Sequence, residues 1–158
     1  MPSTALILAN MGKAKFFTTL DLKSEFHQIQ LSETDREKTA FSVNNGKYEF
    51  CRLPFGLKNA PSVFQRAIDD VLREYIGKFC QVYVDDIIIY STSEEEHVTH
   101  IASVLSKLFD ANMRISPEKS HFFKRSVEYL WCQTKELPPH PQKHKQLQNT
   151  NNHLHYLA

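Results

Sequence analysis

The sequence predicts an α+β fold in which an antiparallel sheet carries helices packed on one face. Segments with strand periodicity alternate along the chain with segments of helix periodicity. Short turns, rather than helical crossovers alone, join several of the strands, and this favours antiparallel pairing over a doubly wound parallel sheet. The 158 residues are 41% apolar and 23% charged, a composition typical of one globular domain with an ordinary core.

The first expected strand covers residues 16–22, where aromatic and β-branched side chains alternate in the sequence FFTTLDL. A second segment of period two lies at residues 27–31, and the short bend KSEF connects the two. We therefore expect two strands or strand-like pieces here.

The strongest hairpin signal is the sequence NNGK at residues 44–47, because these residue types tolerate positive φ angles. It is flanked by alternating segments at residues 39–43 and 48–53. The pattern predicts a β-hairpin over about residues 39–53.

Two helices are expected. Apolar side chains at three- and four-residue spacing over residues 63–75 predict the first, with Asn59 and Pro61 suited to its start and Gly77 to its end. The second has its own start signal, a capping box formed by a serine and a glutamate at residues 93 and 96. Its apolar stripe runs over residues 98–109, and its end is expected near residue 112.

Two apolar β runs at residues 79–84 and 87–90 stand between the helices, separated only by Asp85 and Asp86. Further short strands are expected after the second helix, at residues 113–116, 121–123 and 127–131. We expect one domain over residues 1–135. Residues 136–158 are polar, with too few apolar groups to offset the entropy of ordering, and we expect this tail to be irregular or frayed.

Composition excludes several classes of protein. The longest apolar stretches fall far short of the roughly 20 residues that a membrane helix needs. The ALILA segment at residues 5–9 lacks the basic flank and the length of a secretory signal. The three cysteines fit neither a disulfide framework nor a CxxC zinc site. We expect a protein that is not secreted, has no membrane partner and resides inside the cell, in the cytoplasm or the nucleus.

The net charge of +1 does not by itself indicate binding to nucleic acid. Basic residues are in excess beyond residue 112, and acidic residues before it. A surface that contacts phosphate and an ordinary solvated segment both account for this distribution.

Asp85 and Asp86 are unusual because two like charges lie between apolar strands, where they repel each other. Oxygen ligands without nearby His or Cys suit Mg²⁺ or Mn²⁺ better than zinc. Asp21, at the end of another β run, is the candidate third carboxylate. The alternative interpretation is an acidic hairpin turn and a solvated aspartate.

The segment YVDDIIIYS resembles the YxDD motif of reverse transcriptases, and FFTTLDLKSEFHQIQL resembles their first catalytic motif. The segment KTAFSVNNGKYEFCRLPFGLKNAPSVFQRAIDDVL resembles the region between these motifs. Taken together, the sequence is similar to the polymerase of gypsy-type LTR retrotransposons over about residues 13–130. The resemblance implies the palm of a polymerase, with the hairpin as a partial fingers subdomain.

What the resemblance implies about chemistry is RNA-directed DNA polymerisation, in which a primer 3′-hydroxyl attacks an incoming deoxynucleoside triphosphate. Asp21, Asp85 and Asp86 match the family carboxylates that hold two Mg²⁺ ions, with Mn²⁺ as a substitute. The partners implied are an RNA or DNA template with its primer, and deoxynucleoside triphosphates.

The resemblance also implies substrate contacts. Backbone at Leu22 to Glu25 would lie against the triphosphate, and Phe26 matches an aromatic that excludes a 2′-hydroxyl. Ordinary core packing is the alternative for Phe26. The remaining residues with implied contacts to the base pair or to phosphate are Phe55, Gly56, Lys58 and Lys119. For Lys58, an ordinary surface lysine is an equally open interpretation.

The sequence departs from the family pattern at Glu25, where a glycine is usual, and at Trp131-Cys132, where Gly-His is usual. The rest of the fingers, the thumb and an RNase H region are not part of these 158 residues. We therefore expect a fragment of a retrotransposon Pol polyprotein with little or no polymerase activity of its own. The alternative is a catalytically inactive remnant, or a co-opted module that binds nucleic acid or protein.

Overall fold

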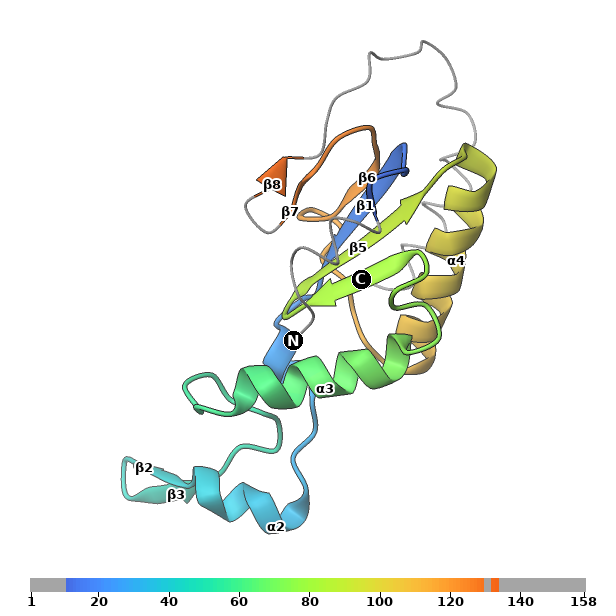
Figure 1. Cartoon of the computed structure of the whole chain (residues 1–158). Helices are drawn as coiled ribbons and strands as arrows, with labels where there is room; N and C mark the ends of the chain where they lie inside the picture. Colours follow the sequence, from blue (N-terminus) through green and yellow to red (C-terminus); the bar gives the residue numbers. More distant parts are fainter. Residues whose placement is uncertain (1–10, 130–131, 134–158) are drawn as a thin grey trace.

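A four-stranded antiparallel sheet forms the centre of the computed structural model, which describes residues 11–129 and 132–133 (Figure 1). The strand order across the sheet is β4-β5-β1-β6. All three neighbouring pairs are antiparallel, as the sequence predicts. The strands are β1 (Phe16–Asp21), β4 (Cys80–Tyr83), β5 (Asp86–Ser91) and β6 (His121–Lys124).

Two long helices, α3 (Ala60–Leu72) and α4 (Glu94–Asp110), pack on one face of this sheet. Their side chains form a single core with Leu20, Ile87 and Ile89. The intervening Ile88 points to the opposite face, where it packs in a smaller cluster with Phe17 and others. Apolar cover on both faces explains why the run at residues 87–90 is continuously hydrophobic rather than alternating.

Local signals account for both helix starts. Pro61 lies in the first turn of α3, where its missing N–H costs nothing. At α4 the Ser93 hydroxyl accepts a hydrogen bond from the backbone N–H of Glu96 at 3.3 Å. The Glu96 carboxylate instead accepts a hydrogen bond from the Thr92 hydroxyl at 2.6 Å, so the reciprocal half of the predicted capping box is replaced by this contact.

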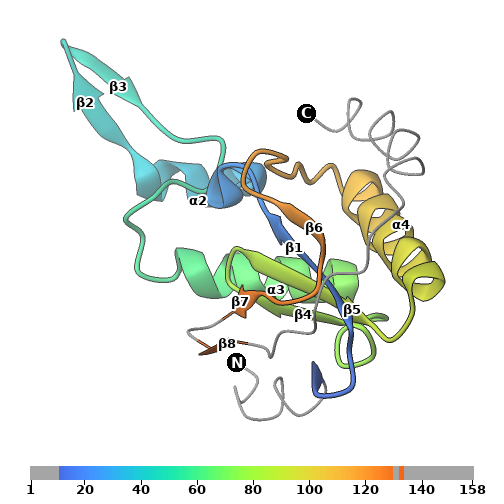
Figure 2. The ribbon, with the colours of Figure 1, turned by 90° about the horizontal axis from the view of Figure 1, so that it is seen from above.

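The predicted hairpin is present but shorter than residues 39–53, with β2 (Phe41–Val43) paired to β3 (Gly46–Tyr48). Its turn residues Asn44 and Asn45 both have positive φ angles, 48° and 64°. Figures 1 and 2 show that the hairpin extends away from the sheet and its two helices. Most of its side chains are exposed.

The prediction of a strand at residues 27–31 is wrong. The chain forms a 3₁₀ helix, η1 (Glu25–Gln28), and only Gln30 makes an isolated bridge, to Arg52. Phe26 and Ile29, which are three residues apart, both pack against the main core. This helical spacing of the buried residues, rather than the alternation of apolar and polar residues, therefore determines the local structure. Two further short helices follow: α2 (Glu33–Arg36) and η2 (Glu37–Thr39).

The C-terminal strands are only partly as expected. Residues 113–116 contribute a single bridge, between Ile115 and Leu22, instead of a strand. The strand at residues 121–123 is confirmed as β6. The strand expected at residues 127–131 is represented by β7 (Glu128–Tyr129), which pairs with β8 (Cys132–Gln133).

The tail at residues 136–158 and the family departure at Trp131 lie outside the described residues. Over the part of the chain that is described, no helix is long and apolar enough to cross a membrane.

A buried histidine ties α4 to the sheet. The His97 side chain is fully buried; its Nε2 is 2.9 Å from the Thr18 hydroxyl and its Nδ1 is 2.8 Å from the Ser91 hydroxyl. The Ser91 hydroxyl is also 2.8 Å from Nδ1 of His100. Burial, followed by the nearby charge of His100, lowers the pKa of His97 to about 4.

This network predicts a stability loss in mild acid. Neutral His97 is favoured in the folded state, so its contribution is complete above the unfolded-state pKa of about 6.5 and is lost as the pH falls toward 4. We expect the free energy of unfolding to drop by on the order of 3 kcal/mol over that range, measured by urea unfolding. His97→Gln should flatten the pH dependence of the free energy of unfolding, and His121→Gln, at an exposed histidine, is the control that should not. Equal pH dependence in the unsubstituted protein and both variants would refute the role assigned to His97.

Candidate metal and nucleotide site

Asp21 and Asp86 lie directly opposite each other at the end of the β1–β5 pair. Because side chains alternate along a strand, both belong to the face opposite α3 and α4, while their neighbours Leu20 and Ile87 are in the helix-covered core. The antiparallel register thus brings together two acids that are 65 residues apart in the sequence. It places the first predicted carboxylate on the same side of the sheet as its partner.

Asp85 lies in the two-residue turn that connects β4 to β5, which the Tyr83–Asp86 pair closes. The other turn residue, Val84, has a φ of 54°. Positive φ at the first central residue only is the pattern of a type II′ turn, which normally has glycine there. A β-branched residue in this conformation carries about 1–3 kcal/mol of backbone strain, so the turn depends on its surroundings.

Asp21 and Asp86 are electrostatically perturbed in this arrangement. Desolvation, followed by the charges of Asp85 and Asp21, raises the pKa of Asp86, although its side chain as a whole is exposed. Desolvation also raises the pKa of Asp21; the charge of Lys119 partly offsets it, and the charges of Asp85 and Glu118 add to it. Asp85 is therefore close enough to disfavour the ionised forms of both Asp21 and Asp86, and Asp21 adds to the effect on Asp86.

The segment at residues 116–120 surrounds the backbone of Asp21. The Asp21 carbonyl accepts a hydrogen bond from Ser116 N–H at 2.8 Å, and its own N–H donates to the Ser120 hydroxyl at 3.2 Å. Nζ of Lys119, an exposed side chain, lies 4.0 Å from Oδ1 of Asp21. The predicted lysine and the first predicted carboxylate are thus neighbours.

The donor atoms at this end of the sheet are carboxylate oxygens, which suit a hard divalent cation. Within residues 11–129 and 132–133, however, no three His, Cys, Asp or Glu side chains already form a ready ligand set for a metal ion. The register and the turn bring the acids near one another without arranging them as a closed cage.

The other predicted contacts lie around the loop before α3. Phe26 is partly buried against the main core, with its ring centroid 5.1 Å from that of Phe55 and 5.9 Å from that of Phe64. This position is compatible with core packing and with contact to a substrate sugar. Phe55 is 56% exposed, and Gly56 beside it has a φ of 91° with open space around it.

The two remaining side chains differ in burial. Lys58 is exposed. The side chain of Leu22 is buried in the main core, so only its backbone is available to a substrate, as the resemblance implies.

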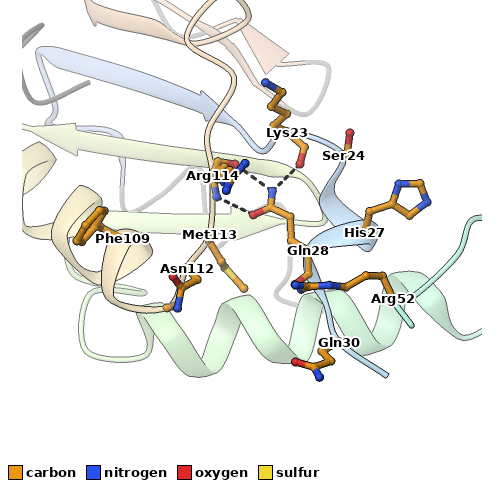
Figure 3. A pocket seen from close by; sticks show the side chains of 11 residues that line it. Lys23, Ser24, His27, Gln28, Gln30, Arg52, Phe109, Asn112, Met113 and Arg114 are labelled. Carbon is orange, nitrogen blue, oxygen red and sulfur yellow. Dashed lines mark hydrogen bonds between the residues drawn. The ribbon is translucent and has the colours of Figure 1, made fainter. Parts of the chain in front are cut away.

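A cleft of about 900 Å³ adjoins the segment that follows Asp21 (Figure 3). The side-chain amide of Gln28 forms part of the cleft wall. It donates hydrogen bonds to the backbone carbonyls of Lys23 and Arg114, at 2.6 and 3.0 Å, and accepts one from the backbone N–H of Arg114 at 2.6 Å. Arg52 donates to the Gln28 carbonyl at 2.9 Å. The residues that line the cleft include three cations and no acid.

Comparison with known families identifies this arrangement. The family model described as reverse transcriptase (RNA-dependent DNA polymerase) matches residues 1–133. The chain belongs to the reverse transcriptase family. The resemblance inferred from the sequence motifs is thereby confirmed.

Relatives of known sequence are parts of much longer proteins. Over 130 residues the chain is 73% identical to the retrovirus-related Pol polyprotein from transposon gypsy of Drosophila melanogaster, with 82% of this chain and 13% of the polyprotein covered. It is 39% identical over 144 residues to the enzymatic polyprotein of cauliflower mosaic virus (strain NY8153), with 91% and 21% covered. The chain thus spans a small fraction of either relative's length.

Solved reverse transcriptases share the fold. A structure of the foamy viral protease-reverse transcriptase in complex with RNA/DNA hybrid matches with a TM-score of 0.72 and 29% identity, over 81% of this chain and 17% of that one. The native prototype foamy virus protein matches with a TM-score of 0.74 and 29% identity, over 99% and 23%. These similarities confirm the α+β architecture of a polymerase palm.

Two glutamines at the site were not predicted from the sequence. Gln28 organises the segment after Asp21, and Gln65 of α3 accepts a hydrogen bond from the N–H of Val84 at 2.7 Å. The only available signal for Gln65 is its place beside the apolar stripe of a helix, where the structure leaves it 7% exposed.

The raised pKa values predict that neutralising one acid stabilises the metal-free chain. Protonated Asp86 is favoured in the folded state, so stability is greatest below its unfolded-state pKa and falls as the pH rises through the higher folded-state value. Asp86→Asn should increase the free energy of unfolding at pH 7 by up to about 1 kcal/mol, measured by urea denaturation with chelator present. Glu49→Gln, on the exposed hairpin side, is the matched control; a destabilised Asp86→Asn protein would contradict the prediction.

Proposed function

We propose that this chain is the palm portion of an RNA-directed DNA polymerase that transfers deoxynucleotides to a primer 3′-hydroxyl. The observation that carries the proposal is the register that sets Asp21 opposite Asp86, with Asp85 in the adjoining turn, in a chain of the reverse transcriptase family. Residues 1–135 would be this palm, with the β2–β3 hairpin as part of the fingers.

Asp21, Asp85 and Asp86 would hold two Mg²⁺ ions, or Mn²⁺ in their place. Oxygen donors and the concentration of negative charge fit such ions. A bound cation would offset the desolvation, and after it the repulsion, that raise the pKa values of Asp21 and Asp86. When bound, the ions would neutralise phosphate charge and lower the pKa of the primer hydroxyl.

The chain's own cations would attract the triphosphate. Lys119 lies beside Asp21. Hydrogen bonds with the Ser116 hydroxyl and the backbone lower the pKa of Glu118, and the nearby charges of Lys23 and Lys119 add to this effect, so these lysines share one neighbourhood. Arg114 lies across the Gln28 amide from Lys23 (Figure 3). This positive charge flanks the backbone from Leu22 onward, where the triphosphate would lie.

The base pair would rest against the loop before α3. Phe55 and Gly56 offer an exposed ring and open backbone, Phe26 packs behind that ring, and Lys58 is exposed toward solvent. An RNA or DNA template with its primer would be the partner, together with the fingers, thumb and RNase H regions of a longer polyprotein inside the cell.

Metal binding provides the first test. The purified 158-residue chain should bind Mn²⁺, monitored by the loss of the free-ion EPR signal, with Mg²⁺ as a competitor. Asp21→Asn and Asp85→Asn should each weaken binding at least about tenfold, because each removes a charged oxygen ligand. Glu49→Gln should bind like the unsubstituted protein; if the two aspartate variants do so as well, the carboxylates are not the site.

Primer extension provides the second test. On an RNA template with Mg²⁺ or Mn²⁺, Asp85→Asn should extend the primer at least about 100-fold more slowly than the unsubstituted chain, since transition-state charge would lose its stabilisation. Equal rates would exclude catalysis by these acids. No extension by the unsubstituted chain is also what a palm without its thumb and most of its fingers would give, so the Mn²⁺ measurement then separates the proposed function from a non-catalytic module.

A further inference from the structure

The turn that carries Asp85 has an unusual conformation that needs support. Val84 has a φ of 54° in a two-residue hairpin loop, at a position where glycine is preferred. Without an external contact, the turn would readily relax to backbone angles that valine favours, and the direction of Asp85 would change with it.

The contact comes from α3. Gln65 is 7% exposed, and its Oε1 accepts the hydrogen bond from the N–H of Val84 at 2.7 Å. Its Nε2 donates to Oδ1 of Asp69, one helical turn further on, at 2.8 Å. Asp69 accepts only from the nitrogen end of the amide, so it sets the amide orientation and leaves the oxygen facing the turn.

We propose that Gln65 is a positioning residue for the metal-binding carboxylates. By accepting a hydrogen bond from the N–H of Val84, Gln65 keeps Val84 at its positive φ angle. The turn then directs Asp85 and Asp86 toward Asp21. The inference rests on the proposed function in that these acids bind divalent ions. It adds a residue of α3, on the other face of the sheet, to the groups on which the site depends.

The test uses the full 158-residue chain with Gln65→Met, which keeps the length of the side chain and removes the acceptor. We expect Mn²⁺ binding to weaken by roughly three- to tenfold, the range that corresponds to one hydrogen bond. We also expect the Val84 amide to lose its protection from hydrogen exchange, measured by NMR without metal. Gln81→Met is the matched control and should change neither quantity, because Gln81 is a second buried glutamine, paired with Ile88 within the sheet rather than at the turn.

A rescue separates positioning from general stability. Adding Val84→Gly to Gln65→Met should restore most of the Mn²⁺ affinity, because glycine adopts positive φ without strain. Failure of this rescue, or a Gln65→Met protein with unchanged affinity, would overturn the proposal. Gln65→Asn, which keeps a polar group but is too short to reach the turn, replaces Gln65→Met if that variant does not fold.

The two proposals fail in different ways. If the unsubstituted chain binds no Mn²⁺, the proposed function fails, and the exchange measurement alone judges Gln65. Retained protection of the Val84 amide in Gln65→Met then refutes the positioning role, and its loss supports control of the turn by Gln65.

Discussion

The pairing of β1 with β5 in one particular register is the constraint on which the site depends. A shift by one residue would turn Asp21 toward the helices and bury it in the core. The register is fixed by apolar side chains on both faces, with Leu20 opposite Ile87 and Phe17 opposite Tyr90. The same hydrophobic contacts that stabilise the sheet therefore determine which acids meet.

The end of the sheet that carries the acids lowers the stability of the folded state. Desolvation, followed by neighbouring like charges, raises the pKa values of Asp21 and Asp86 there, and Val84 has a strained backbone. The opposing stability comes from elsewhere, from the α3–α4 core and the buried His97 network at the β1–β5 strands. Unfavourable terms concentrated at one place, within a fold that tolerates them, are typical of functional sites.

Strands and helices could be predicted where periodicity reflects burial directly, as in α3, α4, β1 and β5. The same rule failed at residues 27–31, because the burial of Phe26 and Ile29 depends on a helix distant in the sequence. The acids were visible as an anomaly of charge between apolar strands. Gln65 was not, because its role depends on the φ angle of Val84, which no local pattern near residue 65 encodes.

The segment at residues 113–120 shows why acids alone would not make a polymerase site. A triphosphate is an anion, and three carboxylates without counter-charge repel it. The bridge between Leu22 and Ile115, together with the hydrogen bonds of Ser116 and Ser120 to the Asp21 backbone, holds this segment along the end of β1. It thereby places Lys119 and Arg114 beside Asp21 and Lys23. Attraction of phosphate and binding of metal would thus depend on one strand end. The positive charge comes from a segment in which local periodicity predicted only a short strand followed by a break.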